Sequence, residues 1–303
     1  MTLCAAYQQF LKEKISEGVT EQTLKYYKYN LPKFIEWCVD NKIENVEDVY
    51  THLFEDYKLY LIENKNGTKK ISLQTYTRAV KTFLLWLNEF IQNVGKLKLI
   101  KAEIANIVPL SDVEVKILLN NFDNSYFGIR NKLMVMFMLD SGLRRGEVVS
   151  LESKNIFMHN NTMLVQGKGE KERLVPFGEE TKRYINRYSH MRNEYEKRFF
   201  QKEDGTPITD NTIKMYFQDL KESTGIIRLH PHLLRHTFAT NYILYGGDVE
   251  ELRILLGHTS LQMTMKYVHL ATQQRILNQR YHSHIDKLFC QYDNKLAQYS
   301  GSF

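Results

Sequence analysis

The scarcity of proline is the feature that most limits how this chain can fold. Proline ends or kinks a helix, and the 303 residues contain only five prolines. Apolar residues recur at steps of three and four, the spacing that places them on one face of a helix. The sequence therefore predicts a mainly α-helical protein.

The composition excludes several classes of protein. The chain is 43% hydrophobic and 25% charged, values that exclude disorder and collagen-like repeats. Its longest unbroken apolar run, Leu133 to Leu139, has seven residues, whereas a membrane span needs roughly 18–20. The N-terminus lacks the features of a signal peptide. Three widely spaced cysteines, Cys4, Cys38 and Cys290, form no disulfide framework. We therefore expect a cytoplasmic protein that does not contact membranes.

The pattern of the chain predicts two domains, as its length also favours. Residues 1–95 have helical spacing and form the first domain. Residues 96–108 lose that period and carry basic charge, so we interpret them as a linker. The second domain covers 109–303, with a C-terminal tail from about residue 275.

Two amphipathic helices with basic outer faces are predicted in the first domain, over 20–38 and 72–91. The net charge of +6 is compatible with a polyanionic partner. Such a helix pair is suited to clasp DNA, although a solvated charged face is the commoner reason for this pattern. The positions predicted to contact DNA are Thr23, Lys25, Lys28, Lys69, Lys70, Gln74, Thr77, Arg78 and Lys81.

The second domain contains the one clear strand signal in the sequence. Segments 162–166 and 173–177 flank a turn, Gly167-Lys168-Gly169, and predict a β-hairpin with a basic tip. This makes the fold mainly α with a small antiparallel sheet. The helices expected around the hairpin cover 131–140, 179–200, 209–223, 231–245, 248–256 and 260–268.

Arginines occur at two positions suited to phosphate. Arg144 follows a buried helix, and its planar fork of donors matches phosphate oxygens. An arginine there also complements the helix dipole, and Glu147 is its expected anchor. His232 and Arg235 share one face at the start of a helix, where backbone N–H groups favour an anion.

Three further residues have a functional and an ordinary interpretation. Lys168 at the hairpin tip either reaches into a groove or is simply solvated. His258 follows Gly257 between two helices, where it either binds substrate or caps a helix. Tyr267 is one tyrosine among 19 and carries no signal by itself.

Taken together, these motifs resemble the tyrosine site-specific recombinases, also called the phage integrase family. Their order and spacing both agree with the family across residues 142–267. The matching segments are Gly142-Leu143-Arg144-Arg145-Gly146-Glu147, Gly167-Lys168-Gly169, His232-Leu233-Leu234-Arg235-His236-Thr237-Phe238-Ala239-Thr240, Leu256-Gly257-His258-Thr259-Ser260 and Tyr267.

The resemblance implies an α+β catalytic domain behind a helical core-site-binding domain, and phosphoryl transfer through a 3′-phosphotyrosine intermediate. Nearby cations are expected to favour the phenolate of the nucleophile. Cationic side chains replace metal ions, so no metal or other cofactor is expected. The implied catalytic residues are Arg144 and Arg235 as phosphate clamp, His258 as a further donor, His232 as base or proton relay, Lys168 as general acid and Tyr267 as nucleophile.

The resemblance also implies partners. These are duplex DNA with two inverted core half-sites and a homo-tetramer that exchanges strands through a Holliday junction. The tail either packs on a neighbouring subunit, through Ile276, Ile285, Leu288 and Phe289, or caps its own domain. The closest kinds of enzyme would be a simple-site, Xer-like dimer resolvase and a mobile-element integrase. A type IB topoisomerase-like relaxase and a catalytically silent DNA-binding regulator are the alternatives.

Overall fold

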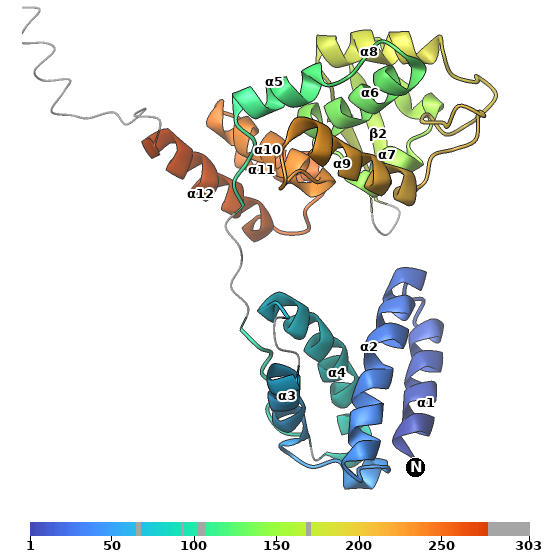
Figure 1. Cartoon of the computed structure of the whole chain (residues 1–303), viewed down its shortest axis with the longest axis vertical. Helices are drawn as coiled ribbons and strands as arrows, with labels where there is room; N and C mark the ends of the chain where they lie inside the picture. The colour runs from blue at the N-terminus through green and yellow to red at the C-terminus, as the bar shows by residue number, and fades with distance from the viewer. Residues whose placement is uncertain (65–67, 93, 102–106, 168–170, 278–303) are drawn as a thin grey trace, which may run out of the picture. The chain divides into compact units, whose positions relative to one another are not determined.

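The structure, a computed structural model, describes all residues except 65–67, 93, 102–106, 168–170 and 278–303 (Figure 1). Within that part the chain is mainly helical with one small antiparallel sheet, as the sequence predicts. Contacts divide it into two compact units, Met1–Asn106 and Ile107–Phe303.

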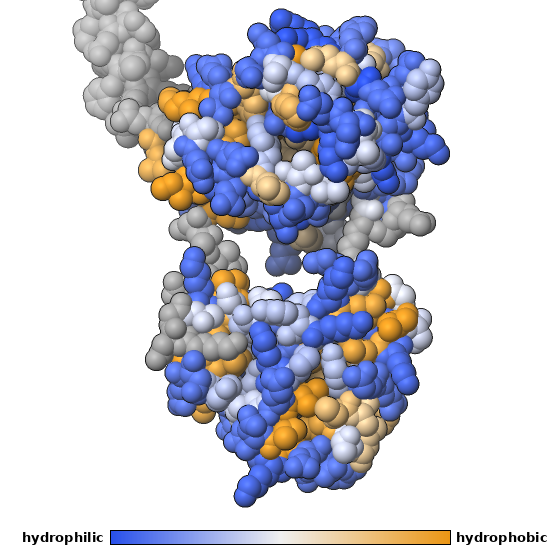
Figure 2. Space-filling view, turned by 45° about the vertical axis from the view of Figure 1, so that its right-hand side comes forward, coloured by the Kyte–Doolittle hydropathy of each residue, from blue (hydrophilic) through white to orange (hydrophobic). Residues whose placement is uncertain are grey.

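The surface has no continuous apolar band on the face that Figure 2 shows. Hydrophilic residues cover most of both units there, and hydrophobic residues gather in separate patches. None of the helices in the described ranges combines the length and hydrophobicity that crossing a bilayer requires.

In the described residues of the N-terminal unit, four α-helices surround an aromatic core. Phe10, Phe34 and Phe83 are fully buried, and the rings of Phe10 and Phe83 pack edge to face with their centroids 5.5 Å apart. The predictions over 20–38 and 72–91 correspond to α2 and α4, while α1 and α3 were not predicted. The elements are α1 (Leu3–Ser16), α2 (Glu21–Asp40), the 3-10 turn η1 (Val46–Asp48), α3 (Leu53–Asn64) and α4 (Lys70–Ile91).

The first unit extends beyond the boundary predicted at residue 95. Leu97 is buried in its core, and Leu99 and Ile100 pack against the same core. Backbone carbonyls of this segment are also bound, since Gln74 Nε2 donates to Ile100 O at 3.0 Å. Apolar side chains within the basic stretch therefore complete the first core, and much of the predicted linker belongs to it.

The second unit packs helices around α6 and the small sheet. Its elements are α5 (Asp112–Asn120), α6 (Tyr126–Asp140), α7 (Arg145–Ser150), η2 (Ser153–Asn155), β1 (Ile156–Phe157), β2 (Thr162–Gln166), β3 (Glu172–Pro176), α8 (Glu179–Ser189), α9 (Asp210–Thr224), α10 (Pro231–Leu244), α11 (Val249–Leu256) and α12 (Gln262–Leu277). Because α6 packs against α7, α8 and α10, ten of its 15 residues are buried.

The predicted hairpin is confirmed as the antiparallel pair β2–β3. Its register runs from Thr162 opposite Pro176 to Gln166 opposite Glu172. The second strand begins one residue earlier than predicted, and the two-residue β1 adds a third strand beside β2.

Two predicted helix ends are wrong. Helix α8 ends at Ser189 instead of residue 200, because Phe199 and Phe200 are buried in the core and Arg192 Nε binds the Phe199 carbonyl. Helix α12 continues to Leu277 instead of residue 268, because Ala271 packs in the same small core as Tyr267. Tyr267 therefore lies within a long helix.

Candidate active site

The turn after α6 places Arg144 at the start of α7. Gly142 makes this turn with a φ of +64°, a conformation that glycine adopts without strain. Glu147 then caps the helix, since its Oε2 accepts from the Arg144 backbone N–H at 2.8 Å. Arg144 Nη1 donates to Glu147 Oε1 at 2.8 Å. The expectation that Glu147 anchors Arg144 is confirmed.

Glu147 also binds an arginine that the sequence analysis missed. Arg173 on β3 donates from Nη1 to Oε1 at 2.9 Å and from Nη2 to Oε2 at 2.8 Å. Its Nε donates to Leu255 O at 2.7 Å. Burial raises the pKa of Glu147. Hydrogen bonds and charge from Arg173, and hydrogen bonds from Arg144, lower it by more than burial raises it, so the pKa lies below its ordinary value. Arg173 lies two residues before the buried Val175 on β3. Because alternate residues of a strand point to the same face, this spacing is a weak sequence signal that the Arg173 side chain points inward.

Arg235 completes what we call the arginine cluster: Arg144, Arg173 and Arg235 around Glu147. It is 3% exposed, and its Nη1 lies 4.0 Å from Glu147 Oε2. Its two Nη groups donate to Gly142 O at 2.7 Å and Leu256 O at 2.5 Å. Burial and the neighbouring Arg144 lower the pKa of Arg235 to about 10, so at neutral pH the guanidinium is charged. The backbone carbonyls of the turn after α6 and of the end of α11 thus hold the buried Arg235 guanidinium in place.

His258 and Tyr267 lie together beside this cluster. His258 Nδ1 is 2.9 Å from Thr264 Oγ1, and its ring stacks on Tyr267 with centroids 6.2 Å apart. Burial, together with Arg235 and Arg144, lowers the pKa of His258 to about 4. The imidazole is therefore neutral at physiological pH.

Tyr267 is held in a buried position. Its side chain is 1% exposed, and Lys266 Nζ lies 4.8 Å from its ring centroid. Burial raises the pKa of Tyr267 to about 12, while Arg235 and Arg144 lower it less. This differs from the expectation that nearby cations favour the phenolate, because in this structure desolvation outweighs them.

The side chain at the Tyr267 hydroxyl is that of His236, whereas His232, predicted as base or proton relay, lies elsewhere. His236 Nδ1 lies 2.9 Å from Tyr267 Oη. His232 is instead exposed and lines a cleft of about 370 Å³ with Arg144, Arg145 and the start of the hairpin turn. Helical geometry explains the difference: His232 and His236 are four residues apart on α10, so His236 lies one turn further along the helix.

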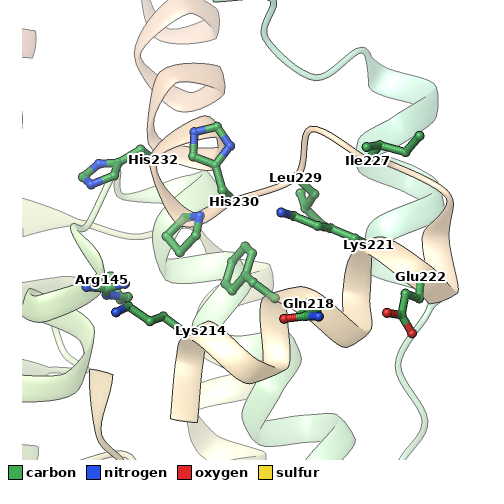
Figure 3. Close-up of a pocket in the computed structure, with 11 residues that line it drawn as sticks. Arg145, Lys214, Gln218, Lys221, Glu222, Ile227, Leu229, His230 and His232 are labelled. Carbon is green, nitrogen blue, oxygen red and sulfur yellow. The ribbon is translucent and has the colours of Figure 1, made fainter. Parts of the chain in front are cut away.

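A second cleft, of about 780 Å³, continues from His232 between α9 and the start of α10. Figure 3 shows His232 and Arg145 at one end of this cleft and Lys221 and Ile227 at the other. The lining is rich in basic side chains, which suits a phosphate backbone. They are Arg145, Lys214, Lys221, His230 and His232.

Some predicted residues lie outside the described part of the chain. These are Lys168 and, in the tail, Ile285, Leu288, Phe289 and Cys290. The adjacent Gly167 is described and lines the clefts that contain Arg144. Ile276 is described and exposed at the end of α12.

The predicted DNA-contacting positions of the first unit differ in exposure. Thr77 is an error, because it is fully buried and its hydroxyl donates to Leu73 O at 3.0 Å. Its position on α4 faces the core between Leu73 and Val80. Thr23 and Gln74 are half-buried, and so is Lys81. The exposed members are Lys25, Lys28, Lys69, Lys70 and Arg78.

The described residues contain no cluster of side chains suited to bind a metal ion. Across residues 1–64, 68–92, 94–101, 107–167 and 171–277, no three His, Cys, Asp or Glu side chains are placed to hold a metal ion. The arginine cluster is instead the main concentration of positive charge next to Tyr267.

Comparison with known proteins decides the family. A family model described as the phage integrase family matches residues 109–274, more than half of the chain. The chain belongs to the phage integrase family. As a member of this family it is a tyrosine recombinase, an enzyme that breaks and rejoins DNA in site-specific recombination. The predicted family and function are confirmed, and the relaxase and regulator alternatives are not favoured.

Relatives in the phage integrase family match most of the chain. A tyrosine recombinase XerC of Staphylococcus epidermidis is 29% identical over 278 residues, which cover 86% of this chain and 90% of the relative. A tyrosine recombinase XerC of Bacillus pumilus is 26% identical over 292 residues, which cover 91% and 94%.

Solved structures share the fold. The crystal structure of XerA recombinase is 25% identical, covers 92% of this chain and 100% of its own, and has a TM-score of 0.52. The Tn1549 transposon integrase in complex with circular intermediate DNA is 18% identical, covers 97% and 99%, and has a TM-score of 0.71. The mainly α fold with a small antiparallel sheet is therefore confirmed for this family member.

Proposed function

We propose that this recombinase cleaves one DNA strand by attack of Tyr267 Oη on the scissile phosphate. The attack forms a 3′-phosphotyrosine link and releases a 5′-hydroxyl. The observation that carries this proposal is the arrangement of Tyr267 beside Arg144 and Arg235, both close enough to act on its pKa. A nucleophile within a cationic, largely water-free site is what attack on an anionic phosphodiester requires.

The arginine cluster is suited to hold the phosphate. Each guanidinium has five N–H donors, and the two bonds from Arg235 to backbone carbonyls leave others for phosphate oxygens. Glu147 keeps the cluster assembled before DNA arrives, so little reorganisation accompanies the reaction. The further roles that we propose are His258 as phosphate donor, His232 as a proton relay in the cleft and Lys168 as general acid for the 5′-oxygen.

We further propose that the substrate is a duplex with two inverted core half-sites, bound by a homo-tetramer that passes through a Holliday junction. Structural relatives support the DNA part of this proposal: one is XerH bound to palindromic difH substrate, and another is a lambda integrase dimer bound to a core site. We also propose that the tail beyond α12 docks on a neighbouring subunit. A DNA substrate and widely spaced cysteines favour the cytoplasm as the place of reaction.

A capture experiment tests the proposal and identifies the site. The full chain is incubated with a library of random duplexes, each nicked near its centre so that the cleaved strand diffuses away. We expect an SDS-stable protein–DNA adduct, and sequencing of the captured DNA to give one site with inverted half-sites. An adduct that persists in Tyr267→Phe would overturn the nucleophile assignment. Relaxation of any supercoiled plasmid, independent of sequence, would instead support a relaxase.

Arg144→Ala provides a second test on the captured site. Losing one donor to a phosphoryl transition state costs on the order of 10²–10³-fold in rate. We expect this variant to bind the site but form adduct slower by about that factor. Arg183→Ala is the matched control, since Arg183 lies on α8 with a 76% exposed side chain. Equal adduct rates for the two variants would contradict the clamp role.

A further inference from the structure

The hydrogen bond at the Tyr267 hydroxyl points to a further catalytic residue. His236 directly follows Arg235 on α10, and its Nδ1 lies 2.9 Å from Tyr267 Oη on α12. Attack on phosphorus requires the phenol to lose its proton, and the acceptor must lie within hydrogen-bonding reach. We propose that His236 accepts the Tyr267 proton during strand cleavage and returns it during rejoining. This inference rests on the proposed function, because it takes Tyr267 as the nucleophile.

The charges around His236 keep its imidazole ready to accept. The charged and titratable groups that face it are Lys266 on α12, His232 and Arg235 on α10, and His230 directly before α10. Burial and these groups lower the pKa of His236 to about 4. The ring is thus neutral at physiological pH, and with its proton on Nε2 the Nδ1 atom accepts from the phenol. The negative charge of a bound DNA phosphate opposes these cations, so it raises the affinity of the ring for a proton during the reaction.

The other basic side chains near Tyr267 do not contact its hydroxyl. Lys266 Nζ lies over the face of the ring, 4.8 Å from its centroid, instead of at the hydroxyl. His258 stacks on the ring, and its Nδ1 is paired with Thr264 Oγ1. His232 is exposed in the cleft with Arg144, where the phosphate is expected. Of the described side chains, His236 is the one that lies within hydrogen-bonding distance of the reacting oxygen, at 2.9 Å.

The proton balance of the step is complete. In cleavage, the bond between Tyr267 Oη and phosphorus forms, the bond between phosphorus and the 5′-oxygen breaks, and the phenol proton moves to His236 Nδ1. The 5′-oxygen takes a separate proton from a general acid, the role proposed for Lys168. In rejoining, the 5′-hydroxyl forms a bond to phosphorus and returns its proton to the group that acted as general acid, the bond between phosphorus and Tyr267 Oη breaks, and the His236 imidazolium protonates the departing phenolate. Burial holds the pKa of the free phenol at about 12, so without such an acceptor little phenolate is available at neutral pH.

Cleavage by the full chain provides the first arm of the test. We measure the single-turnover rate of adduct formation on the captured nicked duplex for wild type, His236→Asn and His269→Asn. General-base catalysis contributes typically 10²–10⁴-fold, so we expect His236→Asn to be slower by a factor in this range. His269 is the matched control because it is exposed on the same helix as Tyr267, and its variant should react at the wild-type rate.

A reaction that bypasses the tyrosine provides the second arm. In a Tyr267→Phe background, the enzyme joins a 5′-hydroxyl strand to DNA that carries a 3′-p-nitrophenyl phosphate. Nitrophenolate leaves without a proton, so adding His236→Asn should leave this rate within a few-fold. The background and the double variant differ only at His236, which isolates its role on the phenol.

The outcomes separate the possibilities. Slow cleavage with normal nitrophenolate release supports the proposal. Equal loss in both reactions shows that His236 only maintains the site and overturns it, as does wild-type or faster cleavage by His236→Asn. If Tyr267→Phe still forms the adduct, the proposed function itself fails, and with it the identity of the nucleophile. Loss of folding in His236→Asn is detected by the unfolding temperature, and His236→Gln then serves as the second variant under the same criteria.

Discussion

Glu147 binds Arg173 through both carboxylate oxygens, at 2.9 and 2.8 Å, while both side chains are more than nine-tenths buried. The pair joins α7 to the strand that follows the hairpin turn. Because Arg173 Nε also donates to Leu255 O at the end of α11, three separated segments meet at one carboxylate. The active site that we propose for this recombinase is therefore built around an acidic residue that does not itself need to contact the phosphate.

Replacing this carboxylate should destabilise the second unit. Removing one partner of a buried ion pair typically costs about 3–5 kcal/mol, because the other charge stays buried without compensation. We expect Glu147→Gln to lower the unfolding midpoint of the second unit accordingly. Glu250→Gln is the control, since Glu250 pairs with Arg253 on the surface of α11, where such pairs contribute about 0–1 kcal/mol. Equal small shifts would contradict the buried network.

The two tryptophans make this measurement selective. Trp37 and Trp86 both lie in the N-terminal unit, so tryptophan fluorescence follows the unfolding of that unit. Far-ultraviolet circular dichroism follows the helices of both units. A variant in the second unit should therefore change the circular dichroism transition and leave the fluorescence transition in place, which is an internal control for the variants at Glu147, Gly142, Gly146 and His258.

A methyl group at Gly142 should disturb the site, whereas one at Gly146 should not. An added Cβ at Gly142 would come within 2.4 Å of Phe238, and the φ of +64° adds strain. Overpacking of this kind costs roughly 1–3 kcal/mol, and the shift also moves the carbonyl that Arg235 binds. We expect Gly142→Ala to lower both stability and adduct formation. Gly146→Ala meets open space within α7 and should be neutral or more stable by up to about 1 kcal/mol. The reverse order would contradict the described turn.

The buried His258 should make stability depend on pH. Burial, Arg235 and Arg144 lower its pKa to about 4 in the folded protein, against about 6.5 when unfolded. Above pH 6.5 the ring is neutral in both states, and between pH 6.5 and 4 the unfolded state binds the proton first. Stability of the second unit should therefore fall as pH drops through this window. His258→Asn should show a shallower fall by circular dichroism, and an unchanged slope would contradict the assigned burial.

Two neighbouring residues of α4 test the correction of the DNA-contacting face. Arg78 is exposed, whereas Thr77 is buried. We expect Arg78→Ala to weaken binding to the captured site and reduce the slope of log K against log salt by about 1, as loss of one phosphate contact predicts. Thr77→Ala should leave binding unchanged and lower the fluorescence unfolding temperature. Loss of DNA affinity only in Thr77→Ala would contradict the described packing.

Local sequence was sufficient to predict the helices that carry the chemistry and the family that uses it. Arg144, Arg235 and His258 each lie in a short segment whose residues are themselves the signal, whereas Tyr267 was identified only by its distance from these segments along the chain. Residues three or four apart on a helix share a face, so periodicity alone placed His232 with Arg235. The same rule failed for Thr77, which lies at the border between the polar and apolar faces of α4, where packing against the other helices decides burial.

What the sequence determined by itself was most of the segments that form helices, the two strands of the hairpin and which reactive groups are present, although α1 and α3 were not predicted. Only the tertiary structure decided which of those groups touch: Arg173 with Glu147, Arg235 with the carbonyls of two distant turns, and His236 rather than His232 with the phenol. The physical reason is that helix formation depends on neighbours within one turn, whereas these contacts depend on how α10, α11 and α12 pack against each other and on the burial that this packing imposes.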